Sequence, residues 1–94
     1  MKKYEVMFII RPNVEEEARK ALIVEIGELF TKTNSTVTKV TEWGMRDLAY
    51  EVDDLRKGYY VLMNVEATPD AVAEFNRVAN IKKENIIRHI IVAE

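Results

Sequence analysis

The sequence of 94 residues contains no cysteine and only one histidine, His89. Without thiols, the chain can form no disulfide, thiolate metal site or iron–sulfur cluster, and it has no cysteine nucleophile. A metal centre built from several histidines is excluded in the same way. We therefore expect no cofactor and no metal, and we expect His89 to pack in the core as a hydrogen-bonded residue.

Long apolar runs are also absent, and neither sign of charge dominates. The longest apolar run, residues 6–10, has five residues, whereas a membrane span needs roughly 18. Fourteen basic and sixteen acidic residues give a formal net charge of −2, which argues against non-specific wrapping of nucleic acid but permits a local basic patch. Apolar residues make up 48% of the chain, enough for one compact core. We expect a single domain over residues 1–94, in a cytoplasmic protein without membrane contact.

The first half of the chain has the pattern of a strand, a helix and a long strand. Alternation over residues 4–10 predicts the first strand. Apolar residues at three- and four-residue spacing predict a helix over 14–32, with Asn13 as N-cap and Glu16 at capping-box spacing. Residues 36–53 are rich in β-branched and aromatic types, and Gly44 within them indicates a bulge or bend.

The second half repeats the order strand, helix, strand. The expected elements are a hairpin loop over 53–58, a strand over 59–67, a helix that starts at Pro69 with Thr68 as N-cap, and a last strand over 86–92. With right-handed crossovers, this order predicts the α+β class and a ferredoxin-like split β-α-β fold. In that fold, two helices cover one face of a four-stranded antiparallel sheet.

The other face of such a sheet, called the open face below, carries no helix. Side-chain alternation places an apolar set on it: Met7, Ile9, Tyr60, Leu62, Ile90 and Val92. On the last strand, we expect Ile87, His89 and Ile91 to face the helices instead. Single exposed apolar residues are ordinary, but a contiguous patch of this kind is typical of a protein contact.

Three activities known on this topology fit the sequence poorly. Acylphosphatases use an arginine and an asparagine after the first strand, where Arg11 and Asn13 lie, but this loop lacks the glycines that wrap backbone amides round a phosphate. Ligand-binding regulatory domains of the ACT type also need a glycine in this turn. The single-strand reader with this topology, the RNA recognition motif, matches residues 57–64 only at the first three positions, so base-by-base stacking is not expected. No small-molecule substrate is expected.

Cations are scattered at the ends of the predicted strands, and they suit phosphate contacts to a folded RNA. They are Lys2, Lys3, Arg46, Arg56, Lys57 and Arg88. Acidic residues lie close to them in the sequence, so a set of solvated, neutralised charges is an equal alternative. Composition alone leaves both interpretations open.

Residues 44–52, GMRDLAYEV, resemble the signature of the family of the sixth protein of the bacterial small ribosomal subunit. The resemblance continues at Tyr4-Glu5, at residues 11–13, at Gly58-Tyr59 and at residues 85–89, and it covers essentially the whole chain. It implies the ferredoxin-like fold and a non-enzymatic, ribosome-bound protein. It also implies binding to the central domain of small-subunit ribosomal RNA and a heterodimer with the basic eighteenth small-subunit protein during assembly of the platform.

The resemblance also implies residues for these contacts. The candidates for RNA phosphate contacts that it implies are Lys2, Lys3, Arg46 and Arg88, and Lys57 joins them as a cation of the predicted hairpin. The candidates for the protein partner are Leu48 and Tyr50 from the motif, which could equally be core residues, and Tyr60 and Leu62 from the open-face assignment. Family members usually carry a second basic residue where this chain has Asp47, which implies that one phosphate contact near the bend is missing.

Overall fold

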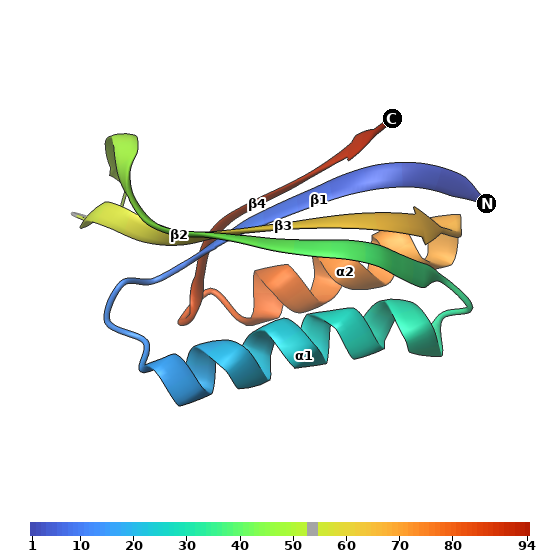
Figure 1. Ribbon diagram of the computed structural model, residues 1–94, viewed down its shortest axis with the longest axis horizontal. Helices are drawn as coiled ribbons and strands as arrows, with labels where there is room; N and C mark the ends of the chain where they lie inside the picture. Colours follow the sequence, from blue (N-terminus) through green and yellow to red (C-terminus); the bar gives the residue numbers. More distant parts are fainter. Residues whose placement is uncertain (53–54) are drawn as a thin grey trace.

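The computed structural model describes residues 1–52 and 55–94, except for the side chains of residues 49, 50 and 52. Its elements are β1 (Lys2–Ile10), α1 (Glu16–Lys32), β2 (Thr36–Val52), β3 (Leu55–Ala67), α2 (Pro69–Ile81) and β4 (Ile86–Ala93). The strands form one antiparallel sheet in the order β2-β3-β1-β4. Both helices cover the same face of this sheet, and the other face carries none (Figure 1). The predicted ferredoxin-like fold is confirmed.

The core lies between the sheet and the two helices, as the alternation of apolar residues predicts. β1 contributes Val6, Phe8 and Ile10, and β3 contributes Val61, Met63 and Val65, all of them buried. Phe75 of α2 packs at the centre, with ring centroids 5.8 Å from Phe30 of α1 and 6.4 Å from Phe8. The inward face of each of these strands therefore agrees with the prediction, and the outward residues are left for the open face.

The two helices begin differently. Thr68 caps α2, because its hydroxyl accepts a hydrogen bond of 3.2 Å from the Ala71 amide, and Pro69 occupies the first helical position as expected. For α1, the expected cap at Asn13 is wrong, since Glu15 is the N-cap and makes no side-chain capping bond. The preceding residues form a turn instead, in which the Val14 amide donates to the Arg11 carbonyl at 3.2 Å.

The strands β2 and β3 continue further toward their connecting loop than expected. β3 begins at Leu55 rather than at residue 59, and Arg46 lies opposite Gly58. The predicted loop over 53–58 is therefore too long, and its residues Asp53 and Asp54 lie outside the described residues. The bulge predicted at Gly44 is confirmed, since the register shifts between Glu42 and Gly44. Gly44 has φ +87°, a conformation that residues with a Cβ rarely adopt.

A second bulge changes the expected register of β4. Ile9 lies opposite Arg88, but Ile10 lies opposite Ile86, so that Ile87 is the extra residue. Ile86 is consequently the buried residue, and the expectation that Ile87 faces the helices is wrong. His89 faces the helices as predicted, with its ring edge-on to Phe75 at a centroid distance of 5.6 Å.

Candidate functional site: the open face of the sheet

The six apolar residues predicted on the open face lie side by side there. Met7 has Leu62 opposite it on β3 and Ile90 opposite it on β4. Ile9 lies opposite Tyr60 in the next row of the sheet. We call this set the apolar patch: Met7, Ile9, Tyr60, Leu62, Ile90 and Val92. Ile90 and Val92 are 55% and 50% exposed, so a partner would bury substantial apolar surface here.

Trp43 extends the apolar patch along β2, although sequence analysis assigned it to neither face. Its ring is nearly parallel to that of Tyr60, with an interplanar angle of 10° and centroids 6.4 Å apart. The bulge before Gly44 interrupts the two-residue alternation, so counting along the strand cannot place Trp43. The available signal was the glycine itself, which indicates a bulge at the adjoining position.

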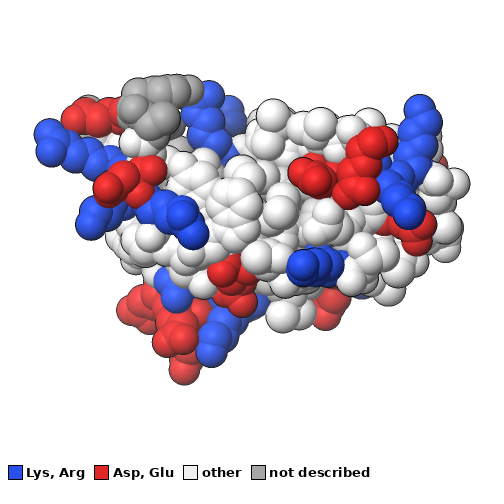
Figure 2. Space-filling model, turned by 45° about the horizontal axis from the view of Figure 1, so that its top comes forward, with Lys and Arg blue, Asp and Glu red and all other residues white. Residues whose placement is uncertain are grey.

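Of the five cations predicted to contact RNA, four form two pairs at opposite ends of the sheet, and Arg88 lies by itself on the edge strand β4. Lys2 and Lys3 lie where β1 begins, which we call the terminal end of the sheet. Arg46 and Lys57 lie at the opposite, hairpin end, on β2 and β3. Arg88 lies opposite Ile9, six residues along β1 from Lys3, which corresponds to about 20 Å. Figure 2 shows the two charged ends and the largely uncharged surface between them.

At the hairpin end, the cations have specific neighbours. The Arg46 Nε donates to the Trp43 carbonyl at 3.3 Å, and its guanidinium carbon lies 5.5 Å from the centroid of the Trp43 ring. Asp47 lies opposite Lys57 in the register, where opposite charges attract across the strands. Arg56 pairs with Glu51 at 3.1 Å. Trp43 therefore holds Arg46 in place, while acidic residues flank the other two cations.

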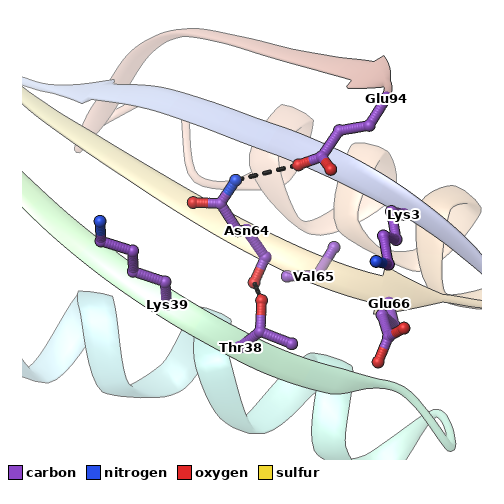
Figure 3. Close-up of a pocket in the computed structure, with 7 residues that line it drawn as sticks. All are labelled: Lys3, Thr38, Lys39, Asn64, Val65, Glu66 and Glu94. Atoms are coloured by element: carbon purple, nitrogen blue, oxygen red, sulfur yellow. Dashed lines mark hydrogen bonds between the residues drawn. The ribbon is translucent and has the colours of Figure 1, made fainter.

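At the terminal end, a shallow hollow of about 450 Å³ opens between β2, β3 and the end of the chain (Figure 3). It is lined by Lys3, Thr38, Lys39, Asn64, Val65, Glu66 and Glu94. The Asn64 side chain donates to Glu94 Oε1 at 3.0 Å, and Lys3 lies opposite Glu66 on β3. Two lysines and two glutamates balance one another in this hollow, so it has no marked preference for an anion.

The sequence matches the model of the family described as ribosomal protein S6 over residues 3–93. The chain belongs to the ribosomal protein S6 family. The crystal structure of 30S ribosomal protein S6 from Thermotoga maritima superposes with a TM-score of 0.92 at 29% sequence identity, covering 99% of this chain and 87% of that one. A protein from Arabidopsis thaliana, with a TM-score of 0.58 and 14% identity over 100% of this chain and 93% of its own, shares the fold alone.

Membership of the S6 family makes the chain a structural constituent of the small ribosomal subunit, and such proteins are not enzymes. Arg11, the residue shared in type with acylphosphatases, joins two loops instead. Its Nε donates to the Lys83 carbonyl at 3.2 Å, and its amide donates to the Asn85 carbonyl at 2.8 Å. Among residues 1–52 and 55–94, no helix is long and apolar enough to cross a membrane.

The motif that carries the S6 resemblance lies partly away from the apolar patch. Gly44 is opposite Tyr60, but Leu48 is four residues further along β2, roughly 13 Å away. Leu48 is half-buried and lines a hollow at the hairpin end with Asp47, Glu51 and Arg56. The side chain of Tyr50 lies outside the described residues. The structure thus places Tyr60 and Leu62 together in the patch and Leu48 apart from them.

On the helix-covered face, Arg19 of α1 contacts the hairpin formed by β2 and β3. Its guanidinium carbon lies 4.0 Å from the centroid of the Tyr59 ring, and the Tyr59 hydroxyl donates to Glu42 Oε1 at 2.8 Å. The hydrogen bond to Glu42 is the main reason that the pKa of Tyr59 is raised above its ordinary value. These two contacts connect α1, through Tyr59 of β3, to the bulged part of β2.

Proposed function

We propose that this S6-family protein binds the central domain of small-subunit ribosomal RNA together with the eighteenth small-subunit protein, as the platform assembles. The observation that carries the proposal is the apolar patch, which is contiguous, lies on a face without helices and is bounded by cations at both ends of the sheet. We also propose that the protein is bound to the ribosome in the cytoplasm and that it needs no cofactor, small-molecule substrate or membrane.

In this proposal, the apolar patch receives the protein partner. Leu62, at its centre, and Tyr60, toward the hairpin end, are both half-buried, so docking would complete their burial. Leu48 and Tyr50 would add contacts further along β2. The net charge of −2 suits a basic partner, because opposite charges steer the two proteins together.

The cations at the two ends would contact RNA phosphates. Lys2 and Lys3 serve the terminal end, and Arg46, Lys57 and Arg88 serve the hairpin end and the adjoining edge strand. Phosphate contacts position a protein on folded RNA without reading its sequence. Since the chain is slightly acidic and its cations are divided, we expect it to bind RNA weakly alone and strongly only once the basic partner has docked.

Titration of labelled junction RNA from the central domain tests this order of binding. The RNA is titrated with the S6-family protein alone, with the partner alone and with both proteins together. The proposal predicts that the two proteins together bind far more tightly than either one does. If this protein binds the junction equally well with and without the partner, the partner-first scheme is wrong.

A further inference from the structure

Trp43 and Tyr60 present two aromatic rings on the open face at the border between the apolar patch and the hairpin end. The rings are parallel within 10°, and their centroids are 6.4 Å apart, so they are offset and hardly cover one another. Trp43 is 42% exposed. A large aromatic surface is therefore available to a flat ligand at this point of the sheet.

A bulge in the backbone of β2 places the Trp43 ring in this position. The register shift between Glu42 and Gly44 inserts Trp43 as the extra residue of the bulge, and the positive φ of Gly44 permits the sharp bend that follows. No atom outside its own segment lies within 4 Å of the position that a Gly44 Cβ would take. Lack of space is therefore not the reason for glycine at position 44, and the positive φ is.

A cation stands next to this ring and is held there. The Arg46 guanidinium lies over Trp43, and its Nε is bonded to the Trp43 carbonyl. Aromatic rings beside a cation are the chemistry that binds unpaired nucleotides, because the base stacks on the ring while the cation meets the phosphate. Contact of this kind tolerates any base, since every base has a π-face.

We propose that Trp43 is a stacking site for one unpaired nucleobase of RNA, with Arg46 contacting the adjoining phosphate. This inference rests on the proposed function, because it takes RNA as the ligand of this protein. Charge favours a nucleotide over the protein partner at this point. The rings are flanked by Arg46, whereas the row of Leu62, Met7 and Ile90 at the centre of the patch is uncharged.

The chain offers a direct probe, since Trp43 is its only tryptophan. The test uses the complex with the eighteenth protein, and the same complex carrying Trp43→Phe supplies the background fluorescence. Two RNAs of equal length are titrated, one with unpaired bases at the junction and one fully paired. We expect the junction RNA to quench the Trp43 signal and the paired RNA to leave it unchanged. An abasic nucleotide at the contacted position should abolish the quenching without any change to the protein.

Affinity gives a second readout. Replacement of Trp43 by leucine, which is apolar but has no ring, should weaken binding of the junction RNA roughly tenfold, and phenylalanine should retain most of the affinity. Both variants should bind the paired RNA like the unmodified protein. Each of these results would support stacking rather than general surface packing.

Other outcomes overturn the inference in distinguishable ways. If the partner alone changes the Trp43 signal and RNA then changes nothing, the ring is a protein contact, and the proposed function stands without the stacking site. Equal junction affinity of the phenylalanine and leucine variants would likewise reject stacking. If the unmodified complex does not bind the junction RNA, the proposed function itself is wrong.

Discussion

Ile9 of β1 occupies the space above Gly58 of β3 that a side chain would otherwise fill. A Cβ added at Gly58 would overlap Ile9 Cγ2, and it would come within 3.5 Å of Ile87 Cδ1 on β4. Ile9 is β-branched and has little rotamer freedom with which to move away. The absence of a side chain at Gly58 therefore lets the apolar patch continue without interruption to the hairpin end.

Substitution Gly58→Ala should lower the free energy of unfolding by about 1–2 kcal/mol, because it overpacks this contact. Denaturant unfolding measures the decrease. The control is the same substitution in an Ile9→Ala background, where Cγ2 is gone and the cost should largely disappear. An equal cost in both backgrounds would show that the Ile9 contact is not the reason for glycine at this position.

Thr68→Ala should cost about 1 kcal/mol of stability, because it removes the N-cap of α2. The same hydroxyl donates to the Thr33 carbonyl at 3.3 Å and so connects the ends of the two helices. Thr68→Ser keeps the hydroxyl and should retain most of the stability in thermal or denaturant unfolding. If serine proves as costly as alanine, packing of the threonine methyl group matters more than the cap.

His89 should make stability depend on pH in the weakly acidic range. Burial, and then the positive charge of Lys83, lower its pKa below the ordinary value of 6.5. The unfolded chain therefore takes up the proton at a higher pH than the folded protein does. Stability is fully present above pH 6.5 and is lost as the pH falls through the lower, folded-state pKa. His89→Leu should abolish this loss of stability when the free energy of unfolding is measured as a function of pH. If His89→Leu keeps the same pH profile, other groups cause the loss.

Arg46→Ala should reduce the salt dependence of RNA binding by the two-protein complex. The slope of log affinity against log salt should become shallower by about 0.9 if Arg46 neutralises one phosphate of a duplex, or by about 0.7 if that phosphate belongs to a single strand. Lys20→Ala is the matched control, since Lys20 lies on α1 in an exposed pair with Glu16 at 3.4 Å. An unchanged slope for Arg46→Ala would remove this residue from the RNA contacts.

The sequence was sufficient to predict the fold and the open face, because β1 pairs with β3 without a register shift, so that side chains of the paired residues alternate between the two faces. The cap of α2 was equally predictable, since Thr68 and Pro69 are local signals that the tertiary structure leaves in place. Asn13 is as suitable a cap by residue type. However, residues 11–14 form a turn, and the Arg11 amide donates a hydrogen bond to the Asn85 carbonyl, so α1 starts only after Glu15.

The candidate site was predicted less completely, and bulges are the common cause. The bulge at Gly44 in β2 brings Trp43 next to Tyr60, and the bulge in β4 buries Ile86 in place of Ile87. An inserted residue reverses the face of the residues on one side of it, so that counting by twos fails across a bulge even where a glycine indicates its approximate position. The division of the cations between two ends of the sheet likewise follows from strand pairing, which joins residues distant in the sequence.

The central claim is that the open face is a docking surface for a protein partner, and a pair of charge substitutions tests it most directly. Leu62→Glu places a carboxylate in the apolar patch, and Val24→Glu places the same group on α1, where Val24 is 58% exposed. Neither residue belongs to the fully buried core, so both variants should unfold cooperatively, like the unmodified protein.

The measurement is the dissociation constant of the heterodimer with the eighteenth small-subunit protein, by calorimetry. We predict that Leu62→Glu weakens the heterodimer by about 100-fold or more, because an unpaired charge buried at a contact costs several kcal/mol, and that Val24→Glu leaves it unchanged. Equal affinity of the two variants would contradict the claim that the partner docks on the open face.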